Sequence, residues 1–283
     1  LMNFIRRKEW INGKHDDGWF NSYYDNHKQA VEGIVNDQVR MMLTGQVFSI
    51  MSGVAENSHI QKIVKSADSY LYQKEAGGYR LNTDFHEVKL DMGRMFGFAY
   101  GEKENGAVFS HMTVMYANAL YRRGFVKEGW KALKTLIDTA MNFSVSHIYP
   151  GIPEYFRADG RGMYSYLTGA ASWLMMTMIT EVFGVRGEAG NLILHPRLLA
   201  EQFDQTGTAS ITIPFAGKVL EIIYKNPDNR DFGSYIIGSA SCDGTALTVN
   251  EEAFVLLLRR QLTALPGNQH TITITLEGGC INP

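Results

Sequence analysis

The chain has 283 residues, with 27 Lys and Arg against 29 Asp and Glu. This length allows one large domain or two smaller ones, and the balanced charge excludes the basic excess typical of proteins that bind nucleic acid or an anionic membrane. The two cysteines, Cys242 and Cys280, lack metal-ligand spacing and no segment is a clean transmembrane run, so we expect a reducing, cytoplasmic location and no membrane partner.

The first part of the chain has the apolar spacing of helices joined by long polar loops. Residues 1–11 resemble the end of a helix, and residues 19–24 predict a short hairpin between two turns. Asn105 is the expected cap of the helix that ends near Arg123. The helices predicted from this spacing are residues 39–52, 60–72, about 106–123, 125–143 and 168–183.

The pattern changes near residues 184–190, after which β-branched residues alternate with polar ones, as in strands. Residues 253–265 fit either a strand or a helix. We therefore divide the chain into an all-helical part, 1–189, and an antiparallel β part, 190–283. Helices alternating with long decorated loops fit a piece of an α-toroid. The predicted strands are residues 191–195, 208–215, 218–225, 234–239 and 271–276.

The loop before the last predicted helix is crowded with charged and aromatic side chains, among them Glu154. Such a loop is usually ordered for a purpose. Thr168 occupies the N-cap position, so the free N–H groups of the following helix suit a phosphate. On spacing alone an ordinary capped helix is the favoured alternative.

A second stretch, Lys103-Glu104-Asn105-Gly106, also precedes a helix, and His111 lies on that helix. Two helix ends aimed at one pocket, with a histidine between them, would hold an oxyanion. Taken alone, His111 is more simply a hydrogen-bonded core histidine, and the charged residues a solvated helix start. The histidines show no His-x-x-x-His spacing, and Gly-x-Ser-x-Gly, Walker and dinucleotide motifs are absent, which argues against a metal enzyme, P-loop or Rossmann chemistry.

Together these stretches resemble the C-terminal half of a glycoside phosphorylase of glycoside hydrolase family 94. That family includes cellobiose, cellodextrin, laminaribiose and 1,2-β-oligoglucan phosphorylases and the phosphorylase-like end of cyclic β-1,2-glucan synthases. The similarity runs in order along nearly the whole chain. It rests on residues 46–53, 103–111, 149–156, 160–173 and 184–187.

The resemblance implies the C-terminal portion of an (α/α)6 barrel at 1–189, followed by a β-sandwich-like domain at 190–283. It implies inverting phosphorolysis of a β-glucan oligosaccharide to α-glucose 1-phosphate, with inorganic phosphate as co-substrate and no cofactor. An inverting hydrolase needs a second carboxylate to activate water, whereas phosphate is itself the nucleophile. The family's phosphate residues map to His111, Thr168 and Gly169, and its sugar-binding residues to Lys103, Glu104 and, less directly, Glu154.

The chain departs from the family in one respect. The family's general acid is an Asp in an Asp-Trp-Asn-Asp-like motif, which this sequence lacks and which we expect upstream, so the chain would hold half a site. We expect it to form a homo-oligomer or to pack against the missing half. A non-catalytic carbohydrate-binding or assembly module of a larger synthase is the alternative. An inverting hydrolase is weaker, because it needs a base carboxylate where His111 and Thr168 stand.

Overall fold

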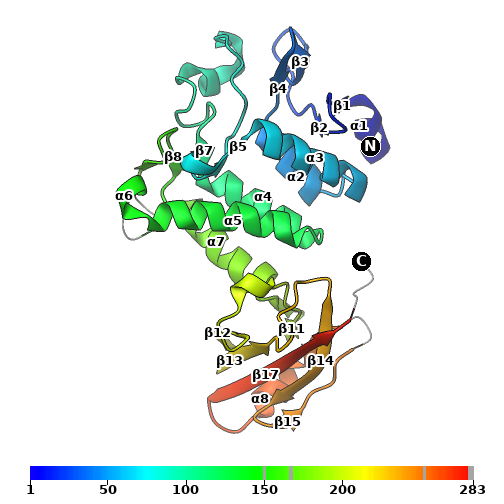
Figure 1. Ribbon diagram of the computed structural model, residues 1–283. Helices are drawn as coiled ribbons and strands as arrows, with labels where there is room; N and C mark the ends of the chain where they lie inside the picture. Colours follow the sequence, from blue (N-terminus) through cyan, green and yellow to red (C-terminus); the bar gives the residue numbers. More distant parts are fainter. Residues whose placement is uncertain (149–150, 166–167, 251–252, 280–283) are drawn as a thin grey trace. The chain divides into compact units, whose positions relative to one another are not determined.

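The computed structural model (Figure 1) describes residues 1–148, 151–165, 168–250 and 253–279. The chain forms two compact units, unit 1 from Leu1 to Met175 and unit 2 from Met176 to Pro283. Both contain helices and small sheets, so the protein is of mixed α and β class. Each unit is described by itself.

Unit 1 is built on helices that match most of the predicted ones. Helix α4 contacts both α2 and α5 and is buried along most of its length, including its polar residues Ser110, Thr113 and Asn118. Helix α5 instead buries one stripe of residues spaced three or four apart. The helices are α1 (Met2–Lys8), α2 (Leu43–Met51), α3 (Asn57–Tyr70), α4 (Ser110–Arg122), α5 (Val126–Met141), α6 (Phe143–Ser146) and α7 (Gly169–Thr177), with 3-10 turns at Lys74–Ala76 and Leu90–Gly97.

Short strands connect these helices. The hairpin expected at residues 19–24 does not form there. Gly18–Phe20 instead pairs with the upstream strand Trp10–Asn12, and Asp16 and Asp17 lie in the connection between them. The strands of unit 1 are β1 (Trp10–Asn12), β2 (Gly18–Phe20), β3 (Gly33–Val35), β4 (Gln38–Arg40), β5 (Tyr72–Gln73), β6 (Gly78–Tyr79), β7 (Val108–Phe109), β8 (Tyr155–Phe156) and β9 (Gly162–Met163). They pair as β1-β2, β3-β4, β5-β6 and β7-β8-β9.

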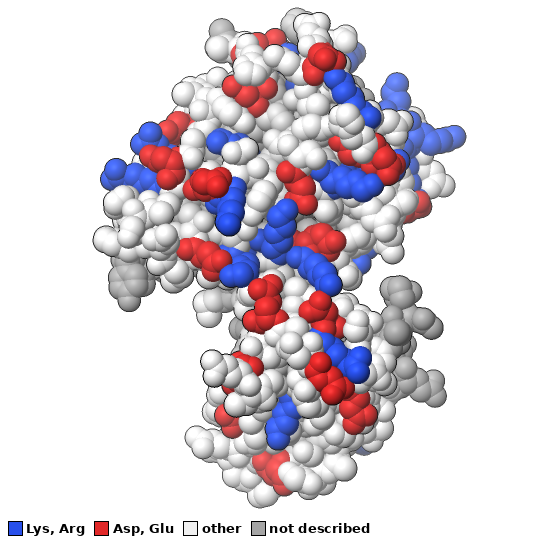
Figure 2. Space-filling view, viewed as in Figure 1, with Lys and Arg blue, Asp and Glu red and all other residues white. Residues whose placement is uncertain are grey.

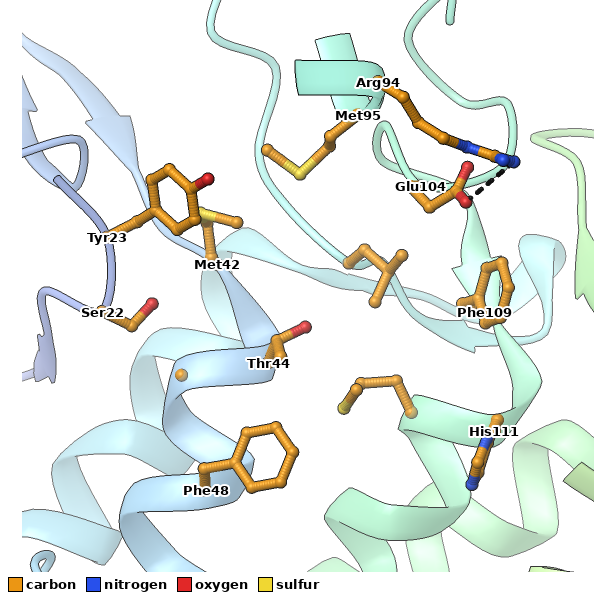
Figure 3. Close-up of a pocket in the computed structure, with 13 residues that line it drawn as sticks. Ser22, Tyr23, Met42, Thr44, Phe48, Arg94, Met95, Glu104, Phe109 and His111 are labelled. Atoms are coloured by element: carbon orange, nitrogen blue, oxygen red, sulfur yellow. Dashed lines mark ion pairs between the residues drawn. The ribbon is translucent and has the colours of Figure 1, made fainter. Parts of the chain in front are cut away.

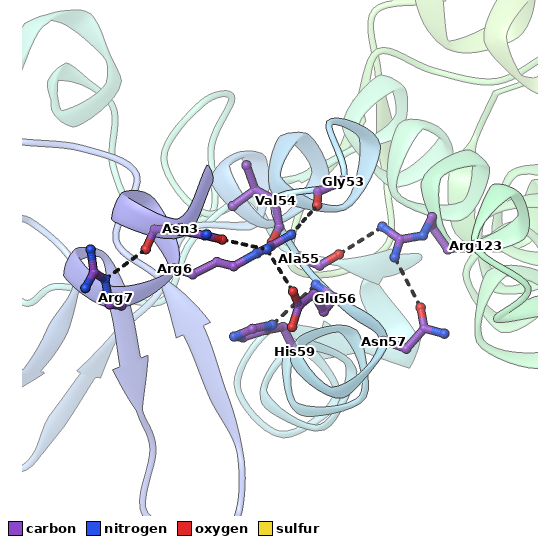
Figure 4. A network of polar contacts seen from close by, with 10 residues as sticks. All are labelled: Asn3, Arg6, Arg7, Gly53, Val54, Ala55, Glu56, Asn57, His59 and Arg123. Carbon is purple, nitrogen blue, oxygen red and sulfur yellow. Dashed lines mark hydrogen bonds and ion pairs between the residues drawn. The ribbon is translucent and has the colours of Figure 1, made fainter. Parts of the chain in front are cut away.

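Two arginines tie the ends of the helices together (Figure 4). Arg6 of α1 donates to the carbonyls of Gly53 and Val54 and pairs with Glu56 at 2.7 Å. Arg123, which ends α4, donates to the carbonyls of Ile50 and Ala55 and to Asn57 Oδ1. The turn between α2 and α3 is thereby fixed to α1 and α4, so α2, which carries part of the pocket described below, has a defined position.

Unit 2 contains a five-stranded sheet of order β12-β13-β17-β14-β15 and a three-stranded sheet of order β10-β11-β16. The predicted strands at 208–215 and 218–225 have the observed bounds. Residues 253–265 form both alternatives, a strand and then a helix. The elements are β10 (Val185–Glu188), β11 (Asn191–Leu194), β12 (Thr208–Phe215), β13 (Lys218–Lys225), β14 (Tyr235–Cys242), β15 (Thr245–Ala246), β16 (Val255–Leu257), α8 (Arg259–Ala264) and β17 (Gln269–Gly278), with a π turn at Met178–Val182 and a 3-10 turn at Ala200–Gln202.

The prediction of an entirely antiparallel β part is wrong at one pairing. Strand β17 lies between β13 and β14, and it pairs with β13 in parallel, Leu220 opposite His270, while its pairing with β14 is antiparallel. A parallel pair needs a long connection, and residues 226–268 provide one. The pairing therefore depends on a distant part of the chain that local alternation does not reveal.

Along the chain, unit 2 begins at Met176, whereas the predicted division lies between residues 189 and 190. The residues after α7 bond into the β part rather than the helical part. Tyr224 donates its hydroxyl proton to the carbonyl of Phe183 at 2.6 Å, and the N–H of Arg197 donates to Val182 at 3.0 Å. The last turn of the predicted helix thus belongs structurally to unit 2.

Gly184 offers a test of packing in unit 2. It has φ +65°, and a Cβ there would lie 1.7 Å from the carbonyl oxygen of His195. We expect Gly184→Ala to lower the free energy of unfolding by more than about 3 kcal/mol, since left-handed strain of about 1–2 kcal/mol adds to a backbone clash. Gly217→Ala is the matched control, because Gly217 has φ +78° but open space around it. Equal denaturation midpoints for the two variants would contradict this packing.

The surface carries acidic and basic side chains interspersed on the face shown in Figure 2. Among the described residues, no helix is long and apolar enough to cross a membrane. Cys242 is a buried free thiol, and Cys280 lies outside the described residues.

Candidate active site

Pairing of β7 with β8 brings the two charged stretches side by side. Val108 lies opposite Phe156 and Phe109 opposite Tyr155, and the N–H of Ser110 donates to the carbonyl of Glu154 at 3.0 Å. Helix α4 begins immediately after β7, so His111, its second residue, is held at the edge of this small sheet. The strands therefore fix the position of the histidine relative to the loop that contains Glu154.

The structure also places His111 against Gly169, the first residue of α7. A Cβ at Gly169 would lie 2.6 Å from Cε1 and 2.8 Å from Nδ1 of the histidine ring. Thr168 Oγ1 accepts a hydrogen bond from the N–H of Ala170 at 3.2 Å, so its predicted role as helix cap is confirmed. Any side chain larger than hydrogen at Gly169 would collide with the ring, and His111, Thr168 and Gly169 thus lie together.

The histidine ring is packed in an apolar environment. Its centroid lies 5.7 Å from that of Trp173 on α7, and its Nε2 is buried with no hydrogen-bond partner in the described part of the chain. Burial lowers the pKa of His111 below its ordinary value, because a charged ring is poorly solvated there. The ring is therefore neutral at pH 7 and carries one N–H donor.

A pocket of about 640 Å³ opens between α2 and the β7–α4 junction (Figure 3). Its lining is mostly apolar, with a few polar groups, as in many small-molecule sites. Of the residues predicted to form a site, Glu104 and His111 line it. The lining residues are Ser22, Tyr23, Met42, Thr44, Gly45, Phe48, Leu81, Arg94, Met95, Glu104, Phe109, His111 and Met112.

Glu104 contributes a carboxylate to the same pocket. One oxygen pairs with Arg94 at 3.1 Å, and the other, Oε2, is buried without a hydrogen-bond partner in the described part of the chain. A buried acceptor of this kind normally finds a partner. Two of the residues that line the pocket thus have a buried polar atom without a hydrogen-bond partner among the described residues, Oε2 of Glu104 and Nε2 of His111.

Lys103 does not line this pocket. Its backbone has φ +45°, and its ammonium lies 4.6 Å from the ring centroid of Tyr164 and 5.5 Å from that of Phe98. A hydrogen bond with Tyr164 raises the pKa of Lys103, and the charge of Glu154 adds to this in a smaller degree. Lys103 therefore lies close enough to Glu154 for their charges to interact, and neither residue lines the pocket.

The expectation that Asn105 caps a helix is wrong. Its side chain donates to the carbonyl of Phe98 at 2.8 Å and accepts from Asn82 at 3.1 Å, inside a buried turn. Strand β7 intervenes, and α4 begins only at Ser110, after Phe109, which has no side-chain cap. Of the two capped helix ends expected at the site, the structure contains the one at Thr168.

Sequence reasoning did not identify Arg94 or the wall that contains Ser22, Tyr23 and Thr44. Arg94 lies between the predicted helices 60–72 and 106–123, and the wall forms through contacts between segments distant in sequence, so no local motif marks either. No group of three or more His, Cys, Asp or Glu side chains that could hold a metal ion occurs among the described residues.

Comparison with known proteins gives one family match and several relatives. The profile described as "Glycosyl hydrolase 94 superfamily, catalytic domain" matches residues 2–184. The chain is 28% identical over 184 residues to cellobionic acid phosphorylase of Neurospora crassa, covering 60% of this chain and 23% of that protein. It is 23% identical over 291 residues to 3-O-β-D-glucopyranosyl-β-D-glucuronide phosphorylase of Paenibacillus borealis, covering 98% of this chain and 34% of that protein.

A further relative is the cyclic β-(1,2)-glucan synthase NdvB of Rhizobium meliloti, 24% identical over 196 residues, covering 65% of this chain and 7% of that protein. The chain thus spans only a minor part of the length of these relatives. Among solved structures, a sialidase gives a TM-score of 0.50 at 11% identity, covering 82% of this chain and 22% of that one, which is a likeness of fold alone.

Proposed function

Since the chain belongs to the catalytic-domain family of the glycosyl hydrolase 94 superfamily, we propose that it forms part of the catalytic unit of an inverting β-glucoside phosphorylase. The reaction converts a β-glucan oligosaccharide and phosphate into α-glucose 1-phosphate and a shortened glucan. The relatives whose names describe phosphorylases support this reaction class. In this proposal unit 1 contributes the C-terminal part of an (α/α)6 barrel, and unit 2 is the sandwich-like domain that follows it.

The observation that carries the proposal is the pair of buried polar atoms at one pocket, Nε2 of His111 and Oε2 of Glu104. Buried groups left without partners are costly in a folded protein. A bound ligand that donates a hydroxyl to Glu104 and presents an oxygen to His111 would satisfy both. A sugar beside a phosphate is such a ligand.

Phosphate would lie beside His111 and the start of α7, which are in contact with each other. The neutral ring supplies an N–H, Gly169 supplies a backbone N–H at the positive end of the helix, and Thr168 supplies a hydroxyl. No cofactor is needed, because phosphate attacks the anomeric carbon directly as the bond to the leaving sugar breaks. Its charge also stabilises the oxocarbenium-like transition state.

The remaining predicted residues would act on the sugar. Glu104, held by Arg94, would accept from a hydroxyl of the glucose that is transferred, and Lys103 and Glu154 would border it. The proton for the leaving group would come from a carboxylic acid outside this chain. The test is a complete protein containing this chain, incubated with β-linked glucose disaccharides and phosphate and followed by proton NMR. Release of α-glucose 1-phosphate supports the proposal, and release of free β- or α-glucose without phosphate ester overturns it.

A second candidate is a non-catalytic carbohydrate-binding or assembly module of a larger β-glucan synthase. The similarity to a short part of NdvB favours it. Such a module would bind a glucan equally well with and without phosphate. Calorimetric titration of the chain with β-1,2-glucan oligosaccharides, at zero and at saturating phosphate, distinguishes the two, because the phosphorylase site predicts that the two ligands affect each other's affinity.

Self-association is the expected behaviour of the chain in solution. Several large apolar side chains of unit 1 are exposed, including Phe4 of α1 at 57% and Phe48 of α2 at 52%. A groove of about 480 Å³ between α1 and α2 is lined by Ile5, Phe48 and Met51 among others. Contiguous apolar surface of this kind favours association. Light scattering should give a mass above 31.8 kDa, and a clean monomer that binds no hydrophobic dye would contradict the expectation.

A further inference from the structure

Glu32 forms a buried polar centre that contacts Ser22 and Met42. These two residues belong to the pocket wall that lies across from Glu104 and His111 in Figure 3. Glu32 is 5% exposed to solvent. One carboxylate oxygen accepts from Ser22, from N–H at 2.9 Å and from Oγ at 2.5 Å. The other accepts from the N–H of Met42 at 2.7 Å and from Gln46 Nε2 at 3.4 Å. Ser22 and Met42 both line the pocket, so one carboxylate joins its two wall segments.

Gly45 makes this junction tight. A Cβ at Gly45 would lie 2.1 Å from Cβ and 2.2 Å from Oγ of Ser22, so Ser22 rests directly on the backbone of α2. Tyr23, the next residue, is 44% exposed and lines the pocket. The position of the Tyr23 ring therefore depends on how Ser22 is held between Gly45 and Glu32.

The groups that contact the Glu32 carboxylate are all uncharged. Charged groups on the surrounding elements have other partners: Glu9 beside β1 accepts from Asn21 and Tyr24, Arg40 of β4 pairs with Glu87, and Asp25 accepts from the backbone of its own turn. Burial without a counter-charge raises the pKa of Glu32 from 4.5 to about 7. Its charge thus changes in the neutral range, and protonation removes one acceptor from the junction.

We propose that Glu32 is a positioning residue that holds Ser22 and Tyr23 against α2 and so shapes the end of the pocket that receives the second sugar of a β-linked disaccharide. The inference rests on the proposed function, in which Glu104 and His111 receive the first sugar and phosphate. The apolar C–H face of a sugar ring packs on an aromatic side chain, and Tyr23 and Phe48 provide such faces here. Ionised Glu32 accepts from all four donors and keeps this wall in place.

The experiment is an NMR titration of the isotope-labelled chain from pH 5 to 9, following the amides of Ser22 and Met42 and the ring of Tyr23. All three should titrate together with a midpoint near 7. Affinities for sophorose, laminaribiose and cellobiose are measured in parallel at saturating phosphate. The best-bound disaccharide should lose roughly tenfold in affinity between pH 8 and pH 6, following the ionised fraction of a group with a pKa near 7.

Two variants test whether Glu32 causes the pH dependence of disaccharide binding. Glu32→Gln turns an amide donor toward Ser22, so it should bind the disaccharide about as weakly at pH 8 as the unmodified chain does at pH 6, and it should lose the tenfold change between these two pH values. Glu9→Gln is the matched control, because Glu9 contacts the same loop at Asn21 and Tyr24 without lining the pocket, and it should keep the full pH dependence. His111 also titrates in the pocket, and its contribution is the part that persists in Glu32→Gln.

The outcomes separate this inference from the proposed function. If no disaccharide binds to the isolated chain but the Ser22, Met42 and Tyr23 signals titrate together, the positioning role stands, and release of α-glucose 1-phosphate by a complete protein decides the phosphorylase assignment. If a disaccharide binds with the same pH dependence in Glu32→Gln, the positioning role is wrong. The titration of the unmodified chain tests the positioning role even if a variant does not fold. Absence of a midpoint near pH 7 at the amides of Ser22 and Met42 would also overturn that role.

Discussion

Replacing His111 by Ala in a complete protein that contains this chain should raise the KM for phosphate by roughly 10- to 150-fold, with little change in the affinity for the glucan. The estimate follows from the loss of one hydrogen bond to a charged ligand, about 1.5–3 kcal/mol. The ring lies against Gly169 and its Nε2 has no hydrogen-bond partner among the described residues, so its removal costs few internal bonds. Initial-rate kinetics at varied phosphate and fixed glucan measure the effect.

His59→Ala is the control for this variant. His59 is likewise a histidine of unit 1 packed against aromatic rings, those of Trp10 and Phe20, and its pKa is also lowered by burial, but it does not line the pocket. It should lower stability without changing the phosphate KM. Equal rises in the KM for phosphate and for glucan in His111→Ala would mean that the ring only supports the fold.

The chain by itself should release α-glucose 1-phosphate at a rate about 100- to 10,000-fold below that of a complete protein. Protonation of the leaving group by a positioned acid typically contributes a factor of this size. The sequence lacks the Asp-Trp-Asn-Asp-like motif that would supply that acid. In the proposed mechanism no carboxylate of this chain acts as the general acid. Enzyme-coupled detection of glucose 1-phosphate from a panel of β-glucans measures the rate.

Glu104→Gln in the isolated chain is a useful companion to that assay. Clear phosphorolysis by the isolated chain would show that it contains a general acid, and loss of kcat with unchanged KM in Glu104→Gln would identify Glu104 as the acid rather than a sugar-binding group. Either result would contradict the assignment of a half-site. Negligible release from both proteins agrees with it.

Local patterns predicted the elements whose formation depends on local chemistry. Alternation of β-branched and polar residues gave the bounds of β12 and β13, and apolar spacing gave α3 and α5 within a few residues. Thr168 was predicted as a cap because a Thr hydroxyl at the N-cap position can accept a hydrogen bond from a free N–H of the first helical turn, and its bond to Ala170 agrees.

What the sequence did not reveal depends on contacts between distant segments. Val108 and Phe109 continue the apolar spacing of α4, but they pair with Tyr155 and Phe156 as a strand. The helix therefore starts later than predicted, and Asn105 does not cap it. In the sequence, nothing distinguishes Glu32 from other charged residues of a turn-rich segment. Only the folded chain shows that Ser22, Met42 and Gln46 surround its carboxylate.

The central claim is that His111 and the first turn of α7 form a phosphate site. The most direct measurement is the chemical-shift response of the labelled chain to inorganic phosphate at constant ionic strength, with sulfate and chloride in parallel. The account predicts saturable shifts concentrated at the His111 ring and the amides of Gly169 and Ala170, displaced by α-glucose 1-phosphate. Shifts confined to other helix starts, such as Asn57 of α3 or Val126 of α5, with His111 unaffected, would contradict it.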